Sequence, residues 1–586
     1  MGIQAVLKAL PLVLALAAMT AGAGVKWFTV DPMSETPYLP DKPPADGCEG
    51  APVQIVAARG EYEPGSFVLV ADRDLGKVTF DVGDLRRADG RVFPKARLDL
   101  KTIKVWYQAG NAWNSYFADC KLKLCPELLL NDEDMIKVDT KKGWNYARTK
   151  EKDGTVKYRW LNPPRNVDSR VEDVGWRYNK IDDSFQGMRE NFSDAPTHQG
   201  ATLGKGEYKQ FFLTANVTKD TAPGLYKGEV KVRGGGEGGE VGIPVSLRVL
   251  DFELPDPKCY FDIEKDYNVW FCDYISLDYI KAVNGGDHKL AERQLMAINA
   301  DFVRHGQILP SYRDSREHPE YGQKVGMVFD ERLIPGGMYL GEKAEMRYQA
   351  RRQKEALTKK FGWHRFYLGW GDEFGLAILR GVRDMVEIYH EEGFRWPVNS
   401  HSGYEAAGYL SDLWWPPYHP DQKSAPATFK YNQLGGDGYF GWYACQHVGT
   451  ENPAFNRRQY GFGAYRAGFS CAFNYAHHIL GWNDLGEAYR KMMFVYGTGN
   501  GCVDTLQWEG FREGLDDIRY ATKLMQLAKP MALSENPAAR YEAKKALQLI
   551  ADADGDNFDL TTLRLEMIRH IEKLIALGAT TSGSNR

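Results

Sequence analysis

Two adjacent carboxylates, Asp372 and Glu373, are the sharpest chemical feature of the sequence. They stand in the run Gly-Trp-Gly-Asp-Glu-Phe-Gly over residues 369–375, where a strand-like segment gives way to its loop. Carboxylates held close together in partly apolar surroundings raise the pKa of at least one of them, so that one stays protonated while the other is ionised. Cleavage of a glycosidic bond requires that division of labour. A solvent-exposed, chemically idle Asp-Glu pair is the alternative interpretation.

Polar and aromatic side chains follow further predicted strands, and they are candidates for contacting a substrate. They are Asn399, His401, Trp414, Trp415, Trp442, Tyr443 and Tyr475. Flat aromatic rings suit the apolar faces of sugars, and amide or hydroxyl groups suit sugar hydroxyls. Packing in an apolar core is the alternative interpretation for each of them.

No motif indicates a metal ion or a cofactor, and we expect neither. His477 and His478 are adjacent, but no HExxH pattern or evident third ligand accompanies them. The eight cysteines show no metal-binding spacing, and neither a phosphate loop nor a GxSxG elbow is present. The chemistry is therefore expected to come from protein side chains alone.

The elements that must position the carboxylates alternate between helices and strands over residues 258–514. Helical patterns cover 287–299, 345–360 and 376–392, and strand-like runs fall at 301–303, 364–370, 396–399, 413–415, 440–443 and 469–473. This alternation and length predict a (β/α)8-like catalytic barrel, whose active site would lie at the carboxyl ends of its strands. A doubly wound open sheet is the alternative, although no GxGxxG opens a helix.

Two other regions flank the predicted barrel, so the chain is expected to be a multidomain β plus α/β protein. Residues 24–255 show short apolar runs separated by Gly, Pro and Asp, which is typical of an antiparallel β-sandwich. Its clearest hairpin is predicted between 209–213 and 226–230, and a polar, irregular insertion at about 140–196. Residues 515–578 predict C-terminal helices, with Asn536 capping one of them and an apolar stripe from Leu560 to Leu574 on another. The tail 579–586 is expected to be disordered.

The N-terminus has the order of a secretory signal peptide over residues 1–23. Lys8 precedes the apolar run 9–19, and the small residues Ala21-Gly22-Ala23 follow it. We expect cleavage to leave a mature chain that begins near Gly24 and is exported to the periplasm or outside the cell. No other stretch of the sequence looks membrane-spanning.

Composition limits the class of partner. The formal net charge of −4 gives no electrostatic reason to bind nucleic acid or an anionic membrane. Aromatic residues make up 13% of the chain, which suits an oligosaccharide or polysaccharide substrate but is also common in β-rich cores. The sequence leaves the oligomeric state open.

Three segments together resemble glycoside hydrolase family 123 and proteins that share its barrel. The first comprises 57–63, 210–213, 222–228 and 250–255 and resembles the leading β-sandwich of the family. The second is the Asp372-Glu373 pair, at the position of the family's catalytic strand end. The third is the run Phe-Arg-Glu-Gly-Leu-Asp-Asp-Ile-Arg-Tyr over 511–520, which resembles the segment after the family's barrel. Phe374 departs from the pattern, because the family often has Pro there.

The resemblance implies a secreted, retaining, substrate-assisted glycosidase that cleaves a terminal 2-acetamido sugar, similar to an N-acetyl-β-galactosaminidase. Asp372 would then orient the acetamido N–H, Glu373 would act as acid and base, and Tyr443 could contact the acetamido carbonyl. Arg512 and Asp516, four apart on one helix, are expected to form a structural ion pair. Two alternatives stay open: a glycosidase of a non-acetamido glycan with a separate carboxylate nucleophile, and a non-catalytic carbohydrate-binding protein.

Overall fold

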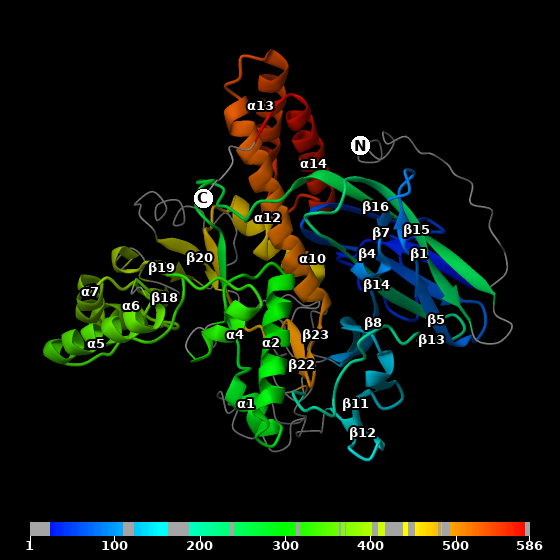
Figure 1. Ribbon diagram of the computed structural model, residues 1–586, viewed down its shortest axis with the longest axis horizontal. Coiled ribbons are helices and arrows are strands. Elements are labelled where there is room, and N and C mark those ends of the chain that lie inside the picture. The colour runs from blue at the N-terminus through cyan, green and yellow to red at the C-terminus, as the bar shows by residue number, and fades with distance from the viewer. Residues whose placement is uncertain are drawn as a thin grey trace.

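The computed structural model shows three regions in chain order: a β-sandwich, a parallel sheet with surrounding helices, and a C-terminal helical region (Figure 1). It describes residues 24–108, 122–161, 187–234, 239–311, 317–362, 365–369, 371–400, 403, 408–416, 438–443, 452–478, 482 and 493–580. The expected signal peptide therefore lies outside the described residues, as do the last six residues of the expected tail.

The sandwich consists of two facing sheets. The six-stranded sheet has the order β2 (Cys48–Glu49), β1 (Val25–Val30), β4 (Glu61–Ala71), β14 (Tyr208–Val217), β8 (Leu98–Gln108), β9 (Lys123–Leu130). The other sheet has the order β13 (Ala201–Leu203), β5 (Gly76–Val82), β15 (Gly224–Arg233), β16 (Glu240–Glu253), β3 (Val53–Arg59). In addition, β6 (Leu85–Arg86) pairs with β15, and β7 (Val92–Phe93) pairs with β6. Inward side chains of both sheets form one core, where the rings of Phe67 and Phe211 stack 5.3 Å apart. The pairing is antiparallel except between β16 and β3.

The predicted hairpin between 209–213 and 226–230 is wrong. β14 pairs with β4 and β8, whereas β15 pairs with β16 and β5, so the turn before Gly224 carries the chain from one sheet to the other. Both strands have an apolar face that must be buried in the same core. That burial is achieved equally well when the two strands lie in facing sheets as when they pair with each other in one sheet. The hairpin of this region is β15–β16.

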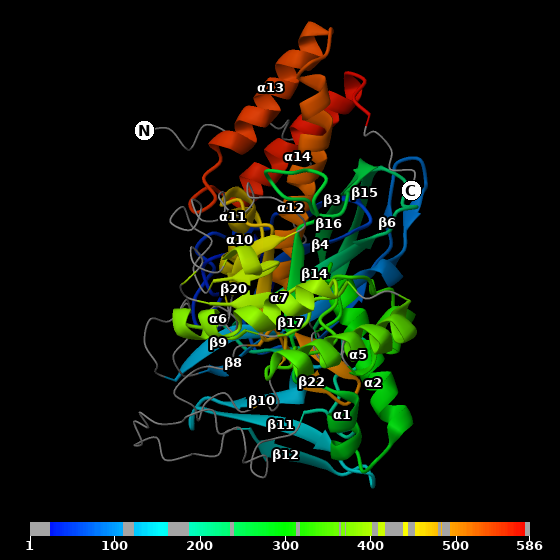
Figure 2. The same cartoon turned by 90° about the vertical axis from the view of Figure 1, so that its left-hand side faces the viewer.

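Part of the stretch expected to be irregular is an ordered antiparallel sheet of β10 (Ile136–Asp139), β11 (Trp144–Lys150) and β12 (Val156–Trp160). Along β11 the buried residues Asn145, Ala147 and Thr149 alternate with partly exposed ones, so one face of the sheet packs on the body of the protein. Residues 162–186 of the predicted insertion lie outside the described residues. Figures 1 and 2 both place β11 and β12 at the same end of the molecule as α1 (Leu277–Val283).

The central region contains a parallel sheet with the order β17 (Asn268–Cys272), β21 (Cys471–Tyr475), β20 (Tyr439–Tyr443), β19 (Leu413–Trp415), β18 (Pro397–Asn399). The first strand therefore lies beside the last, as in a barrel. Single parallel bridges extend the sheet beyond β18 to Tyr367 and Gly371, and then from Leu368 to Gly336. The sheet is a curled parallel half-barrel, and the pairing among the described residues does not show a closed eight-stranded barrel.

Helices cover the outside of the half-barrel. They are α1, α2 (His288–Arg304), α4 (Pro319–Lys324), α5 (Lys343–Phe361), α6 (Leu376–Gly381), α7 (Arg383–Glu391), α10 (Pro453–Tyr460) and α11 (Phe462–Arg466). The strand expected at 301–303 is the last turn of α2, since Leu295, Ile298 and Phe302 continue one buried helical face. The helix expected over 376–392 is two helices that meet at Val382. Among the described residues, no helix is long and apolar enough to cross a membrane.

After β21, the hairpin of β22 (Val495–Thr498) and β23 (Gly501–Asp504) leads to the C-terminal helices. These are α12 (Leu506–Met531), α13 (Pro537–Asp552) and α14 (Leu560–Ala576). Asn536 accepts from the backbone N–H groups of Ala538 and Ala539, which confirms the predicted cap. The predicted stripe from Leu560 to Leu574 is buried.

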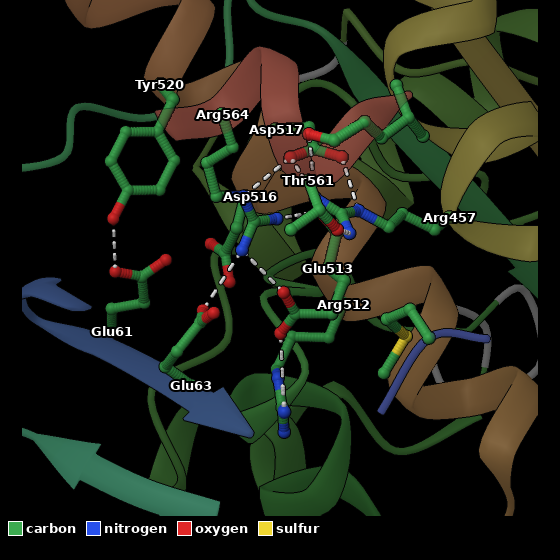
Figure 3. Close-up of polar contacts among 12 residues, drawn as sticks. Glu61, Glu63, Arg457, Arg512, Glu513, Asp516, Asp517, Tyr520, Thr561 and Arg564 are labelled. Carbon is green, nitrogen blue, oxygen red and sulfur yellow. Dashed lines mark hydrogen bonds and ion pairs between the residues drawn. The ribbon is translucent and has the colours of Figure 1, made fainter. Parts of the chain in front are cut away.

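A buried ion network joins the sandwich, the half-barrel helices and the C-terminal helices (Figure 3). Arg564 of α14 donates to Asp517 and Glu513 of α12 at 2.7 and 2.6 Å, and to Glu63 of β4 at 3.0 Å. Arg457 of α10 donates to the other oxygen of Asp517 at 2.7 Å. The network therefore links four elements that are far apart in the sequence.

Three glutamates at this junction, Glu61, Glu63 and Glu513, are protonated more easily than usual. Tyr520 of α12 donates to Glu61 of β4 at 2.8 Å. Burial, together with nearby carboxylates, raises the pKa of Glu61 to about 8. Burial also raises the pKa of Glu63 and of Glu513, although Arg564 opposes the rise in both.

The expected ion pair between Arg512 and Asp516 is not the one that forms. Arg512 pairs with Glu509 at 2.6 Å and contacts Glu513 at 3.5 Å, while Asp516 pairs with Arg519 at 2.6 Å. Arg512 and all three of these acids are buried, and Asp516 is already paired with Arg519, so Arg512 pairs with Glu509 and Glu513 instead. Two of the segments that resemble family 123, 57–63 and 511–520, thus meet at this junction, remote from the Asp372-Glu373 pair in sequence.

Candidate active site

The Asp372-Glu373 pair occupies a tight turn at the carboxyl edge of the parallel sheet. Gly371 forms the last bridge to Val398 of β18, and the two carboxylates follow it with exposed side chains. Glu373 has a φ of 52°, and among the described residues it is the one non-glycine residue with a positive φ. Left-handed backbone costs a residue with a Cβ ~1 kcal/mol or more, and such strain tends to occur at functional sites.

The neighbouring strand end holds this turn from one side. The backbone N–H of Phe374 donates to the carbonyl of Asn399 at 3.2 Å, and the Asn399 N–H donates to the carbonyl of Gly371. The Ser400 hydroxyl donates to the carbonyl of Phe374. Backbone hydrogen bonds from β18 therefore fix where the two carboxylates leave the sheet.

Asn399 also contacts the pair through its side chain. Its Nδ2 donates to Oδ1 of Asp372 at 2.9 Å, and the asparagine side chain is buried beneath the exposed carboxylate. The structure thus brings together two of the predicted site residues, and it does so on adjacent strand ends.

The predicted aromatic contacts lie on different faces of the sheet. Trp414 and Trp442, which are 1% and 0% exposed, belong to the core beneath the surrounding helices. Trp415, Tyr443 and Tyr475 belong to the opposite, inner face. Successive residues of a strand point to opposite faces, so Trp415 and Tyr443 turn inward where their neighbours Trp414 and Trp442 turn outward. The structure does not bring Trp414 or Trp442 to the carboxyl edge.

The inner face is itself filled with aromatic side chains. The ring of Phe473 lies 4.7 Å from that of Trp415 and stacks at 5.4 Å on that of Tyr443. All three rings are buried, and Tyr443 is the last residue of β20. Trp415, Tyr443 and Tyr475 are therefore inner-face aromatics that each end their strand at the carboxyl edge. His401 lies outside the described residues.

Two polar pairs cap the same edge at β17 and β21, and sequence reasoning missed one partner of each, Tyr274 and Asp273. The hydroxyl of Tyr274 donates to that of Tyr475 at 2.9 Å, and Nδ1 of His477 lies 2.8 Å from Oδ2 of Asp273. Asp273 and Tyr274 directly follow the apolar run 268–272. A strand prediction for that run would have placed both at a carboxyl end.

Acidic clusters with a metal-like spacing occur between α2, β23 and α12, outside the Asp372-Glu373 turn. The groups Asp301, Cys502, Asp504 and His305, Asp504, Glu509 each hold potential ligand atoms within 4.8 Å of one another. Arg304 already pairs with both Asp301 and Asp504 in this cluster. Despite burial, Asp301 raises the pKa of His305 to about 9, so this histidine is also a cation. Arg512 pairs with the third carboxylate, Glu509, so each of the three carboxylates has a protein cation as its partner.

A hollow of about 330 Å³ lies on the sandwich rather than at the carboxylate pair. Its lining comes from residues 91–97 and 220–226. It contains no residue of the parallel sheet, so it does not bear on the Asp372-Glu373 site.

The fold is that of a glycoside hydrolase. The solved structure of a family 123 glycoside hydrolase from Clostridium perfringens, which hydrolyses glycolipid glycans, aligns with this chain with a TM-score of 0.60. The alignment covers 94% of this chain and 98% of the Clostridium chain. Sequence identity over the alignment is 11%, so the likeness shows the fold alone. The resemblance to family 123 noted in the sequence is confirmed at this level.

Other similarities are weaker. β-Glucuronidases from Bacteroides uniformis and Parabacteroides merdae align over 80% and 77% of this chain and 51% and 66% of theirs, with 8% and 9% identity. Their TM-scores of 0.26 and 0.29 carry no argument. No protein-family model matches the chain, and no curated protein matches its sequence.

Proposed function

We propose that the protein is an exported, retaining glycoside hydrolase that cleaves a terminal 2-acetamido sugar by a substrate-assisted mechanism. One observation carries the proposal: in a chain with the fold of a family 123 hydrolase, a left-handed turn presents Asp372 and Glu373 at the carboxyl edge of the parallel sheet. Barrel enzymes place their chemistry at that edge.

Adjacent carboxylates suit a reaction in which the substrate supplies its own nucleophile. The acetamido oxygen attacks the anomeric carbon as the bond to the leaving oxygen breaks, and Glu373 gives its proton to that oxygen. Asp372 accepts a hydrogen bond from the acetamido N–H and stabilises the positive charge that develops on the oxazoline ring. The intramolecular attack benefits from proximity, an effect that can reach ~7–11 kcal/mol.

The second step restores the enzyme. Glu373, now ionised, takes a proton from a water molecule, whose oxygen attacks the anomeric carbon and opens the ring. Two displacements on one carbon return the original anomeric configuration. No enzyme nucleophile is needed, so the separation of ~5 Å or more between catalytic carboxyl groups in other glycosidases is not required.

The proposed substrate is a glycan with a terminal 2-acetamido sugar, as for an N-acetyl-β-galactosaminidase. Tyr443 and Tyr475 support this proposal, because they place hydroxyl and ring edges at the carboxyl ends of β20 and β21. Export would follow from the signal-like residues 1–23 and would bring the enzyme to extracellular or periplasmic glycans.

Substitution of each carboxylate tests the proposal. We expect Glu373→Gln to lower kcat/KM on a natural oligosaccharide by ~10²–10⁴, since general acid–base catalysis contributes that much. An aryl glycoside has a good leaving group and would mask the loss in the first step, so both substrates should be measured. Asp384→Asn is the matched control, because Asp384 is an exposed carboxylate that pairs with Lys343 on nearby helices.

The outcome discriminates between the open alternatives. Full activity of Glu373→Gln on the oligosaccharide would remove the acid from the mechanism. Hydrolysis only of sugars that lack an acetamido group would favour a separate carboxylate nucleophile. Glycan binding without turnover across a broad panel would indicate a binding protein.

A further inference from the structure

Asn399 is a buried amide in an unusual setting. Its side chain is 1% exposed, its Nδ2 donates to Oδ1 of Asp372 at 2.9 Å, and its own Oδ1 is buried without a hydrogen-bond partner among the described residues. Leaving a buried acceptor unsatisfied costs ~1–3 kcal/mol. An apolar residue at this position would avoid that cost, so fold stability does not account for an asparagine here.

The contact with Asp372 accounts for the presence of an asparagine at position 399. An amide nitrogen can donate a hydrogen bond but cannot take up or release a proton near neutral pH. A carboxylate at position 399 would repel Asp372, and a hydroxyl is too short to span the same distance. Asparagine therefore directs one oxygen of Asp372 into the protein. Oδ2 of Asp372 accepts no hydrogen bond from the described residues, which leaves it available to a ligand.

The backbone of the turn does not depend on this side chain. The backbone groups of residue 399 bond to Gly371 and Phe374 whichever side chain is present. A change of the Asn399 side chain therefore alters the orientation of the Asp372 carboxylate while the strand end stays in place. The two roles, holding the turn and aiming the carboxylate, can be separated by experiment.

We propose that Asn399 is a positioning residue that holds Asp372 in the single orientation in which Oδ2 faces the substrate, rather than a residue that binds the substrate itself. Its catalytic meaning rests on the proposed function, in which Asp372 accepts the acetamido N–H. The chemistry recognised through Oδ2 is a neutral N–H donor on the sugar ring.

A double-mutant cycle tests the proposal. In the full chain, Asn399→Ala should lower kcat for a 2-acetamido glycoside by about 10- to 100-fold with KM within about 3-fold, as for other supporting residues of active sites. In an Asp372→Ala background the same change should lower kcat by less than about 2-fold, because the carboxylate that Asn399 contacts is already gone. A further loss of equal size in both backgrounds would overturn the proposal.

Asn474→Ala is the matched control. Asn474 is a buried asparagine on β21 whose Oδ1 also lacks a partner among the described residues, but whose Nδ2 donates to the hydroxyl of Tyr460 and not to a carboxylate. We expect a similar fall in melting temperature for the two alanine variants and a fall in kcat for Asn399→Ala alone. If Asn399→Ala does not fold, Asn399→Leu, which nearly keeps the volume and removes the donor without adding a charge beside Asp372, replaces it.

Crystal structures of the wild type and of the Asn399 variant give a readout that does not require activity. The proposal expects one ordered Asp372 rotamer in the wild type and a displaced or multiple rotamer in the variant. If no glycan is hydrolysed but the rotamer moves, the proposed function fails and the positioning role stands. If the enzyme is active and both kcat and the rotamer are unchanged, the positioning role fails.

Discussion

Glu61 offers a quantitative test of how the three regions are held together. Its Oε2 accepts from Tyr520 at 2.8 Å and from the backbone N–H of Ala58 at 2.6 Å, and burial raises its pKa to about 8. The folded chain therefore keeps a proton that the unfolded chain releases near the ordinary carboxyl pKa of 4.5. The stability contributed by this proton is complete below that value and is lost as the pH rises towards 8.

The size of the effect follows from the same interval. One pKa unit is worth ~1.36 kcal/mol, so the step from 4.5 to about 8 sets an upper limit of ~5 kcal/mol. The pKa values of Glu63 and Glu513 are raised as well, by burial and by repulsion from nearby carboxylates. Since Glu61 shares this repulsion with them, the free energy that belongs to Glu61 alone is smaller than the upper limit. Glutamine is a neutral mimic of the protonated acid. As the pH rises from 5.5 to 8.5, we therefore expect the free energy of unfolding of Glu61→Gln to rise by ~2 kcal/mol relative to that of the wild type.

Urea denaturation at a series of pH values, followed by tryptophan fluorescence and by circular dichroism, measures this difference. Glu49→Gln is the control, because Glu49 is an exposed carboxylate of the same sheet that pairs with Lys26 at 2.9 Å. Its stability should follow the wild type at every pH. If the free energies of unfolding of the wild type and of Glu61→Gln change in parallel with pH, the buried acid does not hold a proton at neutral pH.

Three further predictions address the turn, the sheet faces and export. Glu373→Gly should be ~1 kcal/mol more stable than Glu373→Gln, because glycine relieves the left-handed strain, and equal unfolding midpoints would contradict this. Trp442→Phe should lower the free energy of unfolding by ~1–3 kcal/mol and leave KM unchanged, whereas a KM raised more than about 5-fold would place the ring at the substrate. The mass of the exported chain should correspond to a start near Gly24, and an intact N-terminus would exclude signal cleavage.

The elements with a clear local pattern could be predicted from the sequence. The strand Leu413–Trp415 has the predicted bounds, and α5 differs from its predicted range by a residue or two at each end. The Asn536 cap and the Leu560–Leu574 stripe are also local, since each depends on residues within a few turns. Periodicity and capping act over short separations, so a single sequence carries them.

Which strands pair with each other, and which face of a strand points into the half-barrel, could not be predicted in the same way. The sequence shows that β14 and β15 are strands, but the core they share is compatible with both a hairpin and a crossing between sheets. Alternation shows that Trp414 and Trp415 point to opposite faces of β19, but which face is inner depends on where the helices pack. These choices are tertiary, and local propensity does not set them.

In the candidate site, too, the local feature could be predicted from the sequence and the tertiary contact could not. The carboxylate pair could be found because Asp372 and Glu373 are adjacent and follow a strand. The contact from Asn399 crosses 27 residues and requires the register of two neighbouring strand ends, so its role as a support for Asp372 could not be inferred. The left-handed backbone of Glu373 is likewise visible only in the folded chain.

The most direct test of the account is hydrolysis of a terminal N-acetyl-β-galactosaminide, followed by proton NMR of the freshly released sugar. A retaining, substrate-assisted mechanism predicts that the wild type releases the β-anomer first, and that Asp372→Asn and Glu373→Gln each lose activity on an oligosaccharide substrate while staying folded. Release of the α-anomer, or an undiminished rate in a variant that lacks both carboxylates, would contradict it.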